Sequence, residues 1–383
     1  MNVLVLAPVM TKDLCDDYFL YKRLYEKGVK LAFITGQSSG ARANHIRLPF
    51  YENVDGIPIY RLYGSFNEML LFPERRLKKI LEIAKDLKPD LILCHLADNM
   101  NMALHVQKHL KIPIVLHVEI ASDIARTKFR PRAIVKRLIG IPATGPQHWS
   151  WLCKKASAII TSHPPDKKIL HLLSENGKPT YYLPWPASIP EDCELQSIRN
   201  RNRGIYAGLL TQWKNTQQFE WILPLILEKT PTKEFLVIGA GVHAAIIKKL
   251  EEKYHGAIKY IPRLKRREVI NFIANSYYAF TPVKRGGWGF IGDCWGTGTP
   301  LLMLNNIFVS EELDVCVVKN REELIGKINR LYEDPEFYRQ LQDIGYHEFN
   351  KRGVDVVSDE LLNILSKTLK QKGLKAHGKH REN

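Results

Sequence analysis

The chain has 383 residues, 45% of them apolar and 25% charged, which is the composition of a folded globular protein. It excludes a collagenous or disordered chain, and the length favours two domains. Lys and Arg outnumber Asp and Glu by 56 to 40; residues 1–190 hold 27 basic and 16 acidic residues, a net charge of +11. We therefore expect an anionic ligand to meet the first half of the chain.

Nothing in the sequence predicts a membrane span or a disulfide framework. No segment approaches the roughly 20 apolar residues that cross a bilayer. The apolar residues 1–10 lack a basic stretch before them and are interpreted as a buried strand, not a signal peptide. The six cysteines form no C-x-x-C pair, which indicates a reducing compartment and disfavours a zinc ribbon. We expect a cytoplasmic protein.

Short runs of Val, Ile and Leu alternate with helical stretches, as in parallel strands buried on both faces of a sheet. The strands predicted in the first half are Val3–Ala7, Lys30–Thr35, Ile59–Leu62, Leu91–Cys94, Ile114–Val118 and Ala158–Thr161. The pattern restarts after the polar stretch Ser188–Arg203. The second set is Gly204–Ala207, Phe235–Ile238, Ala257–Ile261, Tyr277–Thr281 and Pro300–Leu304.

These runs predict an α/β fold of two doubly wound Rossmann-like domains facing a cleft, with ligands beyond the carboxyl ends of the strands. We expect an N-terminal domain over 1–186, a linker over 187–203 and a C-terminal domain over 204–350. A helix over 351–369 that crosses back to the first domain should follow. The basic tail over 370–383 is expected to be disordered.

Two βα turns of the second domain suit a phosphate group. A predicted strand ends at Gly208, and Lys214 follows near a predicted helix at 218–227, where a cation would favour a diphosphate. The next strand runs into Gly239-Ala-Gly241, a weak signal, because many turns need one glycine. No third glycine and no ribose-binding acid follow at the dinucleotide spacing, so a nicotinamide site is disfavoured. The alternative is ordinary turns with a solvated lysine.

The glycine-rich stretch Thr281–Pro300 follows a strand and leads into a predicted helix. Its backbone N–H groups and the helix dipole would attract an anion. Asp293 lies one turn inside that helix, where it would accept hydrogen bonds from sugar hydroxyls. The alternative is that the glycines only allow tight packing.

In the first domain, His117 and Glu119 share one face of a predicted strand by its period of two. Two polar side chains at the carboxyl end of an apolar strand are costly unless partnered or facing a cleft, and we weigh a site role equally with a structural one. His105 and His109 indicate a solvated helix face, because no third metal ligand accompanies them.

A basic segment without acids follows, and it suits a membrane surface or a phosphate backbone, the alternative being a solvated helix face. Its basic residues are Arg126, Lys128, Arg130, Arg132, Lys136 and Arg137.

Taken in order, the motifs of the second domain resemble the retaining GT-B glycosyltransferases of the GT4 type (glycosyl transferases group 1). The family pattern runs G-R-L-x(3)-K-G, then G-x-G, then an F-L-G strand, then E-G-F-G and finally G-T-P. The resemblance covers roughly residues 203–350 and is thinner over 1–186. The matching segments here are Gly208–Asn215, Gly239–Gly241, Tyr260–Pro262, Gly287–Asp293 and Gly298–Pro300.

The resemblance implies a nucleotide-sugar donor as substrate, with no cofactor and no metal, bound by the second domain, and an acceptor bound by the first. Lys214 would bind the donor diphosphate, and Asp293 takes the place of the family glutamate that binds ribose. The implied donor-binding residues are Gly208, Lys214, Gly239, Lys284, Gly286, Gly287, Trp288, Gly289, Phe290 and Asp293.

The chain departs from the family pattern at two charged positions. Leu209 replaces the family arginine, and Lys284, Arg285 or Gly286 replaces the first acid of the two-glutamate motif. Lys284 or Arg285 would restore the lost phosphate charge. The catalytic candidates are Glu119, His117 and Arg285; the family often has a polar residue near the anomeric centre where Glu119 or His117 falls.

The acceptor expected first is an anionic lipid-linked or cell-envelope glycan, with the protein peripheral at a membrane. A nucleic acid whose base is glycosylated is the alternative. Two other classes remain open. One is a nucleotide-sugar-binding protein without transfer activity, and the other is a GT-B-fold epimerase that uses His117 and Glu119 as acid and base.

Overall fold

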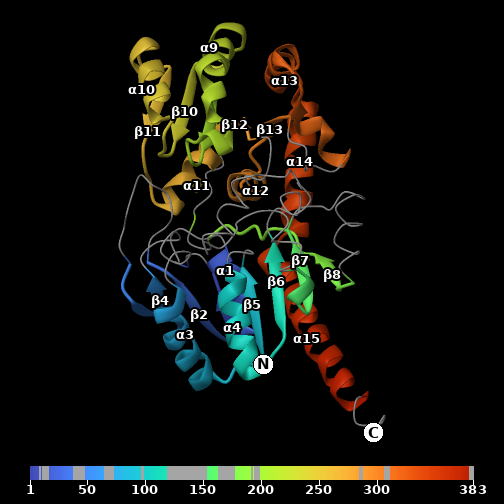
Figure 1. Cartoon of the computed structure of the whole chain (residues 1–383). Coiled ribbons are helices and arrows are strands. Elements are labelled where there is room, and N and C mark those ends of the chain that lie inside the picture. Colours follow the sequence, from blue (N-terminus) through green and yellow to red (C-terminus); the bar gives the residue numbers. More distant parts are fainter. Residues whose placement is uncertain are drawn as a thin grey trace, which may run out of the picture. The chain divides into compact units, whose positions relative to one another are not determined.

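The computed structural model shows two compact units, Met1–Trp185 with Val354–Asn383 (unit 1) and Pro186–Gly353 (unit 2), each an α/β assembly (Figure 1). This confirms the predicted fold class of two doubly wound sheets. The structure describes residues 1–7, 10, 17–37, 48–63, 73–95, 99–118, 153–162, 177–190, 193, 199–283, 288–305 and 311–378.

Unit 1 is built on one sheet, whose described strands lie in the order β3-β4-β2-β1-β5-β6-β7-β8. All neighbours pair in parallel except β3, which runs antiparallel to β4. Strands β2, β3 and β4 lie on one side of β1 and β5 to β8 on the other, so the order reverses between β1 and β5. The strands are β1 (Asn2–Leu6), β2 (Lys30–Gly36), β3 (Tyr51–Val54), β4 (Ile57–Tyr63), β5 (Leu91–His95), β6 (Ile114–Val118), β7 (Ala158–Thr161) and β8 (Thr180–Tyr182).

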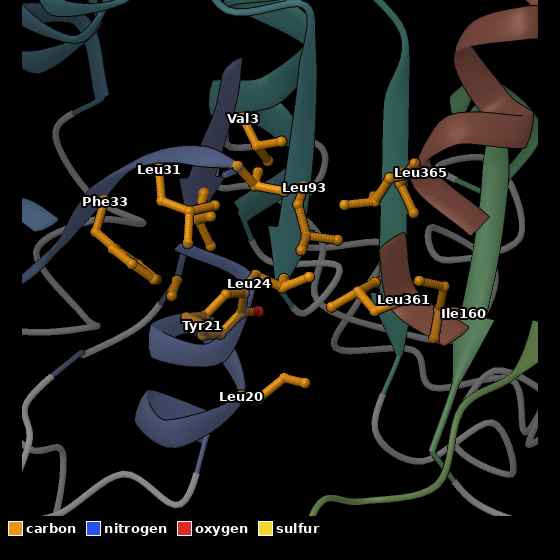
Figure 2. Packing of buried hydrophobic residues seen from close by; sticks show 14 of the residues in the cluster. Val3, Leu20, Tyr21, Leu24, Leu31, Phe33, Leu93, Ile160, Leu361 and Leu365 are labelled. Carbon is orange, nitrogen blue, oxygen red and sulfur yellow. The ribbon is translucent and has the colours of Figure 1, made fainter. Parts of the chain in front are cut away.

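Apolar side chains cover both faces of this sheet because alternate residues of each buried strand point to opposite sides. Leu4 and Leu6 of β1 join the cluster that includes helices α3 (Pro73–Leu87) and α4 (Met100–Leu110). Val3 and Val5 join the cluster formed with α1 (Asp17–Glu26) and α15 (Val354–Gly378). Figure 2 shows side chains of α1, β2 and α15 meeting in that second cluster.

Helix α15 belongs to unit 1 although it comes last in the chain. Arg23 of α1 forms an ion pair with Asp355 at 2.8 Å, and Lys27 does so with Asp359 at 2.7 Å. The helix runs to Gly378, so the prediction of a helix end at 369 and a disordered tail from 370 was wrong as far as 378. The Lys and Gln residues after Leu369 favour a helix, and one internal glycine costs only about 1 kcal/mol. Residues 379–383 lie outside the described part.

Unit 2 is built on a parallel sheet, whose described strands lie in the order β11-β10-β9-β12-β13-β14. Numbered within the unit this order is 3-2-1-4-5-6, that of dinucleotide-binding doubly wound sheets, and it reverses between β9 and β12. The strands are β9 (Asn200–Ala207), β10 (Glu234–Ile238), β11 (Ile258–Ile261), β12 (Ser276–Thr281), β13 (Leu301–Leu304) and β14 (Val317–Val318).

Helices of unit 2 follow its strands in turn. The α-helices are α9 (Phe219–Lys229), α10 (Ala244–Lys253), α11 (Arg266–Asn275), α12 (Trp288–Gly296), α13 (Arg321–Glu333) and α14 (Pro335–Lys351). Short 3₁₀ turns are η2 (Gln212–Lys214), η3 (Thr216–Gln218) and η4 (Glu311–Cys316).

Every strand predicted from an apolar run is present, but β9 begins at Asn200, inside the stretch predicted as a linker. Its first residues are polar because they are partly exposed, and Arg203 forms an ion pair with Glu234 of the neighbouring strand β10. A strand with a polar beginning carries no apolar signal, so its start was missed.

Candidate functional site

The loops that follow β9 and β10, with Pro282 and Val283 after β12, lie at the carboxyl edge of the unit 2 sheet, where the strand order reverses. In open α/β sheets this is where ligands bind. Backbone hydrogen bonds join the first two loops: Gly208 N donates to Ile238 O at 2.9 Å, and Leu210 N donates to Ala240 O at 2.9 Å. His243 N donates in turn to Leu210 O at 3.0 Å. The two loops therefore form one rigid continuation of the sheet.

The glycines of the G-A-G segment are required by this packing. Gly239 and Gly241 have φ angles of +149° and +152°. A Cβ atom would lie 1.8 Å from Gly208 O at the first position and 2.2 Å from Leu210 O at the second. Packing between the two loops is therefore sufficient to explain both glycines. Contact between Gly239 and the donor stays a prediction.

Lys214 is the last residue of η2 and is half-buried. We predicted it near the start of a helix over 218–227; α9 begins at Phe219, and the lysine lies on the loop before it, which contains two 3₁₀ turns. Thr211 caps the first turn, and Asn215 follows with a φ of +56°. The Asn215 amide donates to Pro282 O at 2.9 Å, which ties this loop to the end of β12. The loops after β9 and β10 and the end of β12 are thereby joined by hydrogen bonds, the last of them made by the residue next to Lys214.

Helix α12 begins at Trp288, so Gly289 lies in its first turn, and its Phe290 ring packs 5.4 Å from the ring of Tyr206 in β9. Asp293 is buried and forms an ion pair with Arg266 of α11, with 2.8 Å between Nη2 and Oδ1. In this structure the carboxylate therefore serves α12–α11 packing, and its contact with a ribose stays a prediction. Lys284, Arg285, Gly286 and Gly287 lie outside the described residues.

Sequence reasoning missed Arg352, whose guanidinium stacks on Trp288. Its Cζ lies 4.3 Å from the centroid of the Trp288 ring, and Glu348 lies beside it at 3.5 Å. A stacked cation of this kind fixes the first turn of α12.

A row of buried polar side chains crosses the carboxyl edge of the unit 1 sheet. His117 of β6 engages both ring nitrogens: Nδ1 lies 3.3 Å from His95 Nε2 of β5, and Nε2 lies 2.6 Å from Ser162 Oγ after β7. The Tyr21 hydroxyl of α1 hydrogen-bonds the same His95 Nε2. The predicted site residue His117 is thus partnered.

Its partners were not predicted, because strand order and register bring them together. The β5–β6 register places His95 directly beside His117. The one available signal was that consecutive predicted strands carry a histidine at or near the carboxyl end. Burial, and then the neighbouring His117, hold the pKa of the His95 imidazole well below its usual value. His95 is therefore a neutral ring at physiological pH.

Glu119 and the basic segment Arg126–Arg137 lie outside the described residues. In the described part of the chain, no three His, Cys, Asp or Glu side chains are grouped as a metal site would need. Among these residues, too, no helix has the length and apolar character that crossing a membrane requires.

No protein-family model matches the sequence, and a search of curated proteins found no match either. Solved structures do match. Sucrose-phosphate synthase from Thermosynechococcus elongatus has a TM-score of 0.73 at 12% identity, covering 97% of this chain and 99% of that chain. An α,α-trehalose-phosphate synthase (UDP-forming) from Burkholderia xenovorans, in complex with glucose-6-phosphate, has a TM-score of 0.67 at 13% identity, covering 95% and 99%.

A third match is a protein from Listeria monocytogenes that is assigned as a UDP-N-acetylglucosamine 2-epimerase. Its TM-score is 0.62 at 14% identity, and the match covers 97% of each chain. At these identities the likeness is one of fold. The chain has the GT-B fold.

Proposed function

We propose that the chain transfers a glycosyl group from a nucleotide sugar to an anionic acceptor. Unit 2 binds the donor and unit 1 the acceptor. The observation that carries the proposal is the hydrogen bonding that joins the loops after β9 and β10 to the end of β12, next to Lys214, at the edge where doubly wound sheets bind nucleotides. Two of the solved structures with this fold are sugar-phosphate synthases, one of them UDP-forming.

The proposed chemistry rests on stabilising the leaving diphosphate. Its charge grows as the bond to the sugar breaks, and a nearby cation together with a helix N-terminus stabilises such charge. Lys214 and the first turn of α12 supply these two elements, and Arg285 or Lys284 compensates for Leu209 at the family arginine position. We propose a metal-independent, retaining reaction, which follows from the GT4 resemblance and from the absence of a D-x-D motif in the sequence.

The proposed acceptor is anionic because the first half of the chain carries +11. A phosphorylated sugar is supported by the Burkholderia enzyme, whose structure contains glucose-6-phosphate. The lipid-linked glycan and the nucleic acid expected from the basic segment have no such support. Each of these two acceptors is therefore tested separately in the experiment below.

The experiment measures release of nucleoside diphosphate from a set of nucleotide sugars, with glucose-6-phosphate, a polyprenyl-phosphate glycan in vesicles, or duplex DNA as acceptor. Release that depends on one acceptor, with a new glycosylated product by mass spectrometry, supports the proposal. No acceptor-dependent release with any pair would contradict it.

An epimerase is the second candidate, because the Listeria protein shares the fold and because His95 and His117 lie together at the carboxyl edge of the unit 1 sheet. Nucleotide sugar incubated without any acceptor separates the two. An epimerase would convert it to its epimer, whereas a transferase would at most hydrolyse it slowly.

A further inference from the structure

Four side chains from four elements of unit 1 form one continuous hydrogen-bonded row: Tyr21, His95, His117 and Ser162. Each is more than nine-tenths buried. They come from α1, β5, β6 and the residue after β7, so the sheet holds them at fixed spacing. Such a row is costly to bury unless every member is satisfied.

The positions of the protons follow from the shared atom, His95 Nε2, which is within reach of both the Tyr21 hydroxyl and His117 Nδ1. Because a phenol is a better donor than acceptor, we take Tyr21 as the donor, which leaves the lone pair of His95 on Nε2. His117 Nδ1 must then carry a proton, because two facing lone pairs would repel. A neutral His117 is left with its lone pair on Nε2, where it accepts from the Ser162 hydroxyl.

We propose that Tyr21 and His95 are positioning residues that hold His117 in the Nδ1–H tautomer, so that Ser162 and His117 act as a hydroxyl–base pair. This inference rests on the proposed function. The arrangement matches that of an activated hydroxyl in enzymes, where a base accepts a hydrogen bond from the hydroxyl and a third group orients the base. Here the third group is a neutral histidine.

The pair takes up the proton of the acceptor hydroxyl. That proton moves to Ser162 Oγ while the Ser162 proton moves to His117 Nε2, which becomes an imidazolium. The electron pair of the acceptor oxygen forms the new glycosidic bond on the face of the sugar from which the diphosphate departs, as the proposed retention of configuration requires. The sugar–phosphate bond breaks, and its electrons leave with the nucleoside diphosphate.

The tautomer is measured first and needs no substrate. The full chain is labelled with ¹⁵N-histidine, and long-range ¹H–¹⁵N spectra at pH 7.5 are assigned with H117Q and H95Q. The expected result is an unprotonated Nε2 and a protonated Nδ1 on His117. A protonated Nε2 on His117 would overturn the proposal.

The Tyr21→Phe variant tests whether Tyr21 sets the tautomer. We expect the His117 signals to move towards a mixture of tautomers in Y21F. Tyr278→Phe is the matched control, because Tyr278 is also fully buried and hydrogen-bonds Thr232 at 3.0 Å in unit 2. It should leave the His117 signals in place. Unchanged signals in a folded Y21F would contradict a positioning role.

Kinetics test the relay. S162A and Y21F should each lower kcat at least tenfold with an unchanged KM for the donor, and S162T, which keeps the hydroxyl, should recover activity. Wild-type kcat in S162A would overturn the relay. If the wild-type chain transfers no sugar at all, the proposed function fails, while the tautomer measurement still decides the arrangement of the row.

Discussion

Lys214 is the side chain on which donor binding most depends in this account. It is half-buried on the loop that joins the three strand ends, where water screens its charge less than at an open surface. We predict that Lys214→Ala raises the Kd for a nucleoside diphosphate about tenfold, or about 1.4 kcal/mol.

Titration calorimetry measures this change, with Lys248→Ala as the control. Lys248 is exposed on α10 and lies on no loop of the candidate site. Equal affinities in the wild type and Lys214→Ala would remove Lys214 from the site.

His95 makes the stability of the chain depend on pH. An unfolded histidine titrates near pH 6.5, whereas burial and His117 lower the pKa of His95 well below that in the folded chain. Below about pH 6.5 the unfolded chain therefore binds more protons, and stability falls with acid by up to about 1.4 kcal/mol per pH unit.

Urea unfolding at pH 7.5, 6.5 and 5.5 measures this slope. We predict that His95→Gln flattens it, because glutamine does not titrate. The same slope in the variant would show that other groups cause the acid sensitivity.

At the scale of elements, the loops after β9 and β10 are expected to hold together because their backbones are hydrogen-bonded to each other. We predict that Gly239→Ala destabilises the chain by about 3 kcal/mol or more, since the new Cβ would meet a backbone oxygen that cannot rotate away. Gly326→Ala is the matched control. Gly326 lies inside α13, and a methyl group added there would have nothing within 4 Å, so alanine should stabilise by about 0.5–1 kcal/mol.

Denaturant unfolding compares the two glycine variants directly. A Gly239→Ala variant as stable as Gly326→Ala would mean that the loops can separate without cost. The proposal that these joined loops hold Lys214 in place for the donor would then be wrong.

How much the sequence predicts differs from element to element. The apolar runs predict both sheets, because strands buried on two faces need apolar residues at successive positions. They miss β3 (Tyr51–Val54), whose side chains are partly or fully exposed, the short strands β8 and β14, and the polar start of β9. The row around His117 was also missed, because its members are neighbours across strands and helices and are separated by up to 141 positions between Tyr21 and Ser162.

At the scale of the whole molecule, unit 1 depends on a helix from the far end of the chain. Leu361 of α15 is buried in the cluster shown in Figure 2, to which α1 and β1 also contribute side chains. We predict that Leu361→Ala lowers the stability of unit 1 by about 2–5 kcal/mol through the cavity it leaves.

Hydrogen exchange followed by mass spectrometry measures this effect in each unit. Exchange should rise in β1 and β2 and stay unchanged in β9 and β10, while Asn363→Ala, at an exposed position of the same helix, should change neither. Unchanged exchange in β1 and β2 would show that unit 1 does not need α15.

Transfer as proposed here requires that unit 2 binds a nucleotide sugar. The most direct test is thermal unfolding of the chain with UDP, GDP, ADP and CMP and with their sugar conjugates. A ligand that binds only the folded chain stabilises it by about 2.7 kcal/mol at a hundredfold excess over Kd. We predict a clear rise in Tm with the nucleotides of one base. No rise with any member of the set would contradict donor binding and, with it, the proposed transfer.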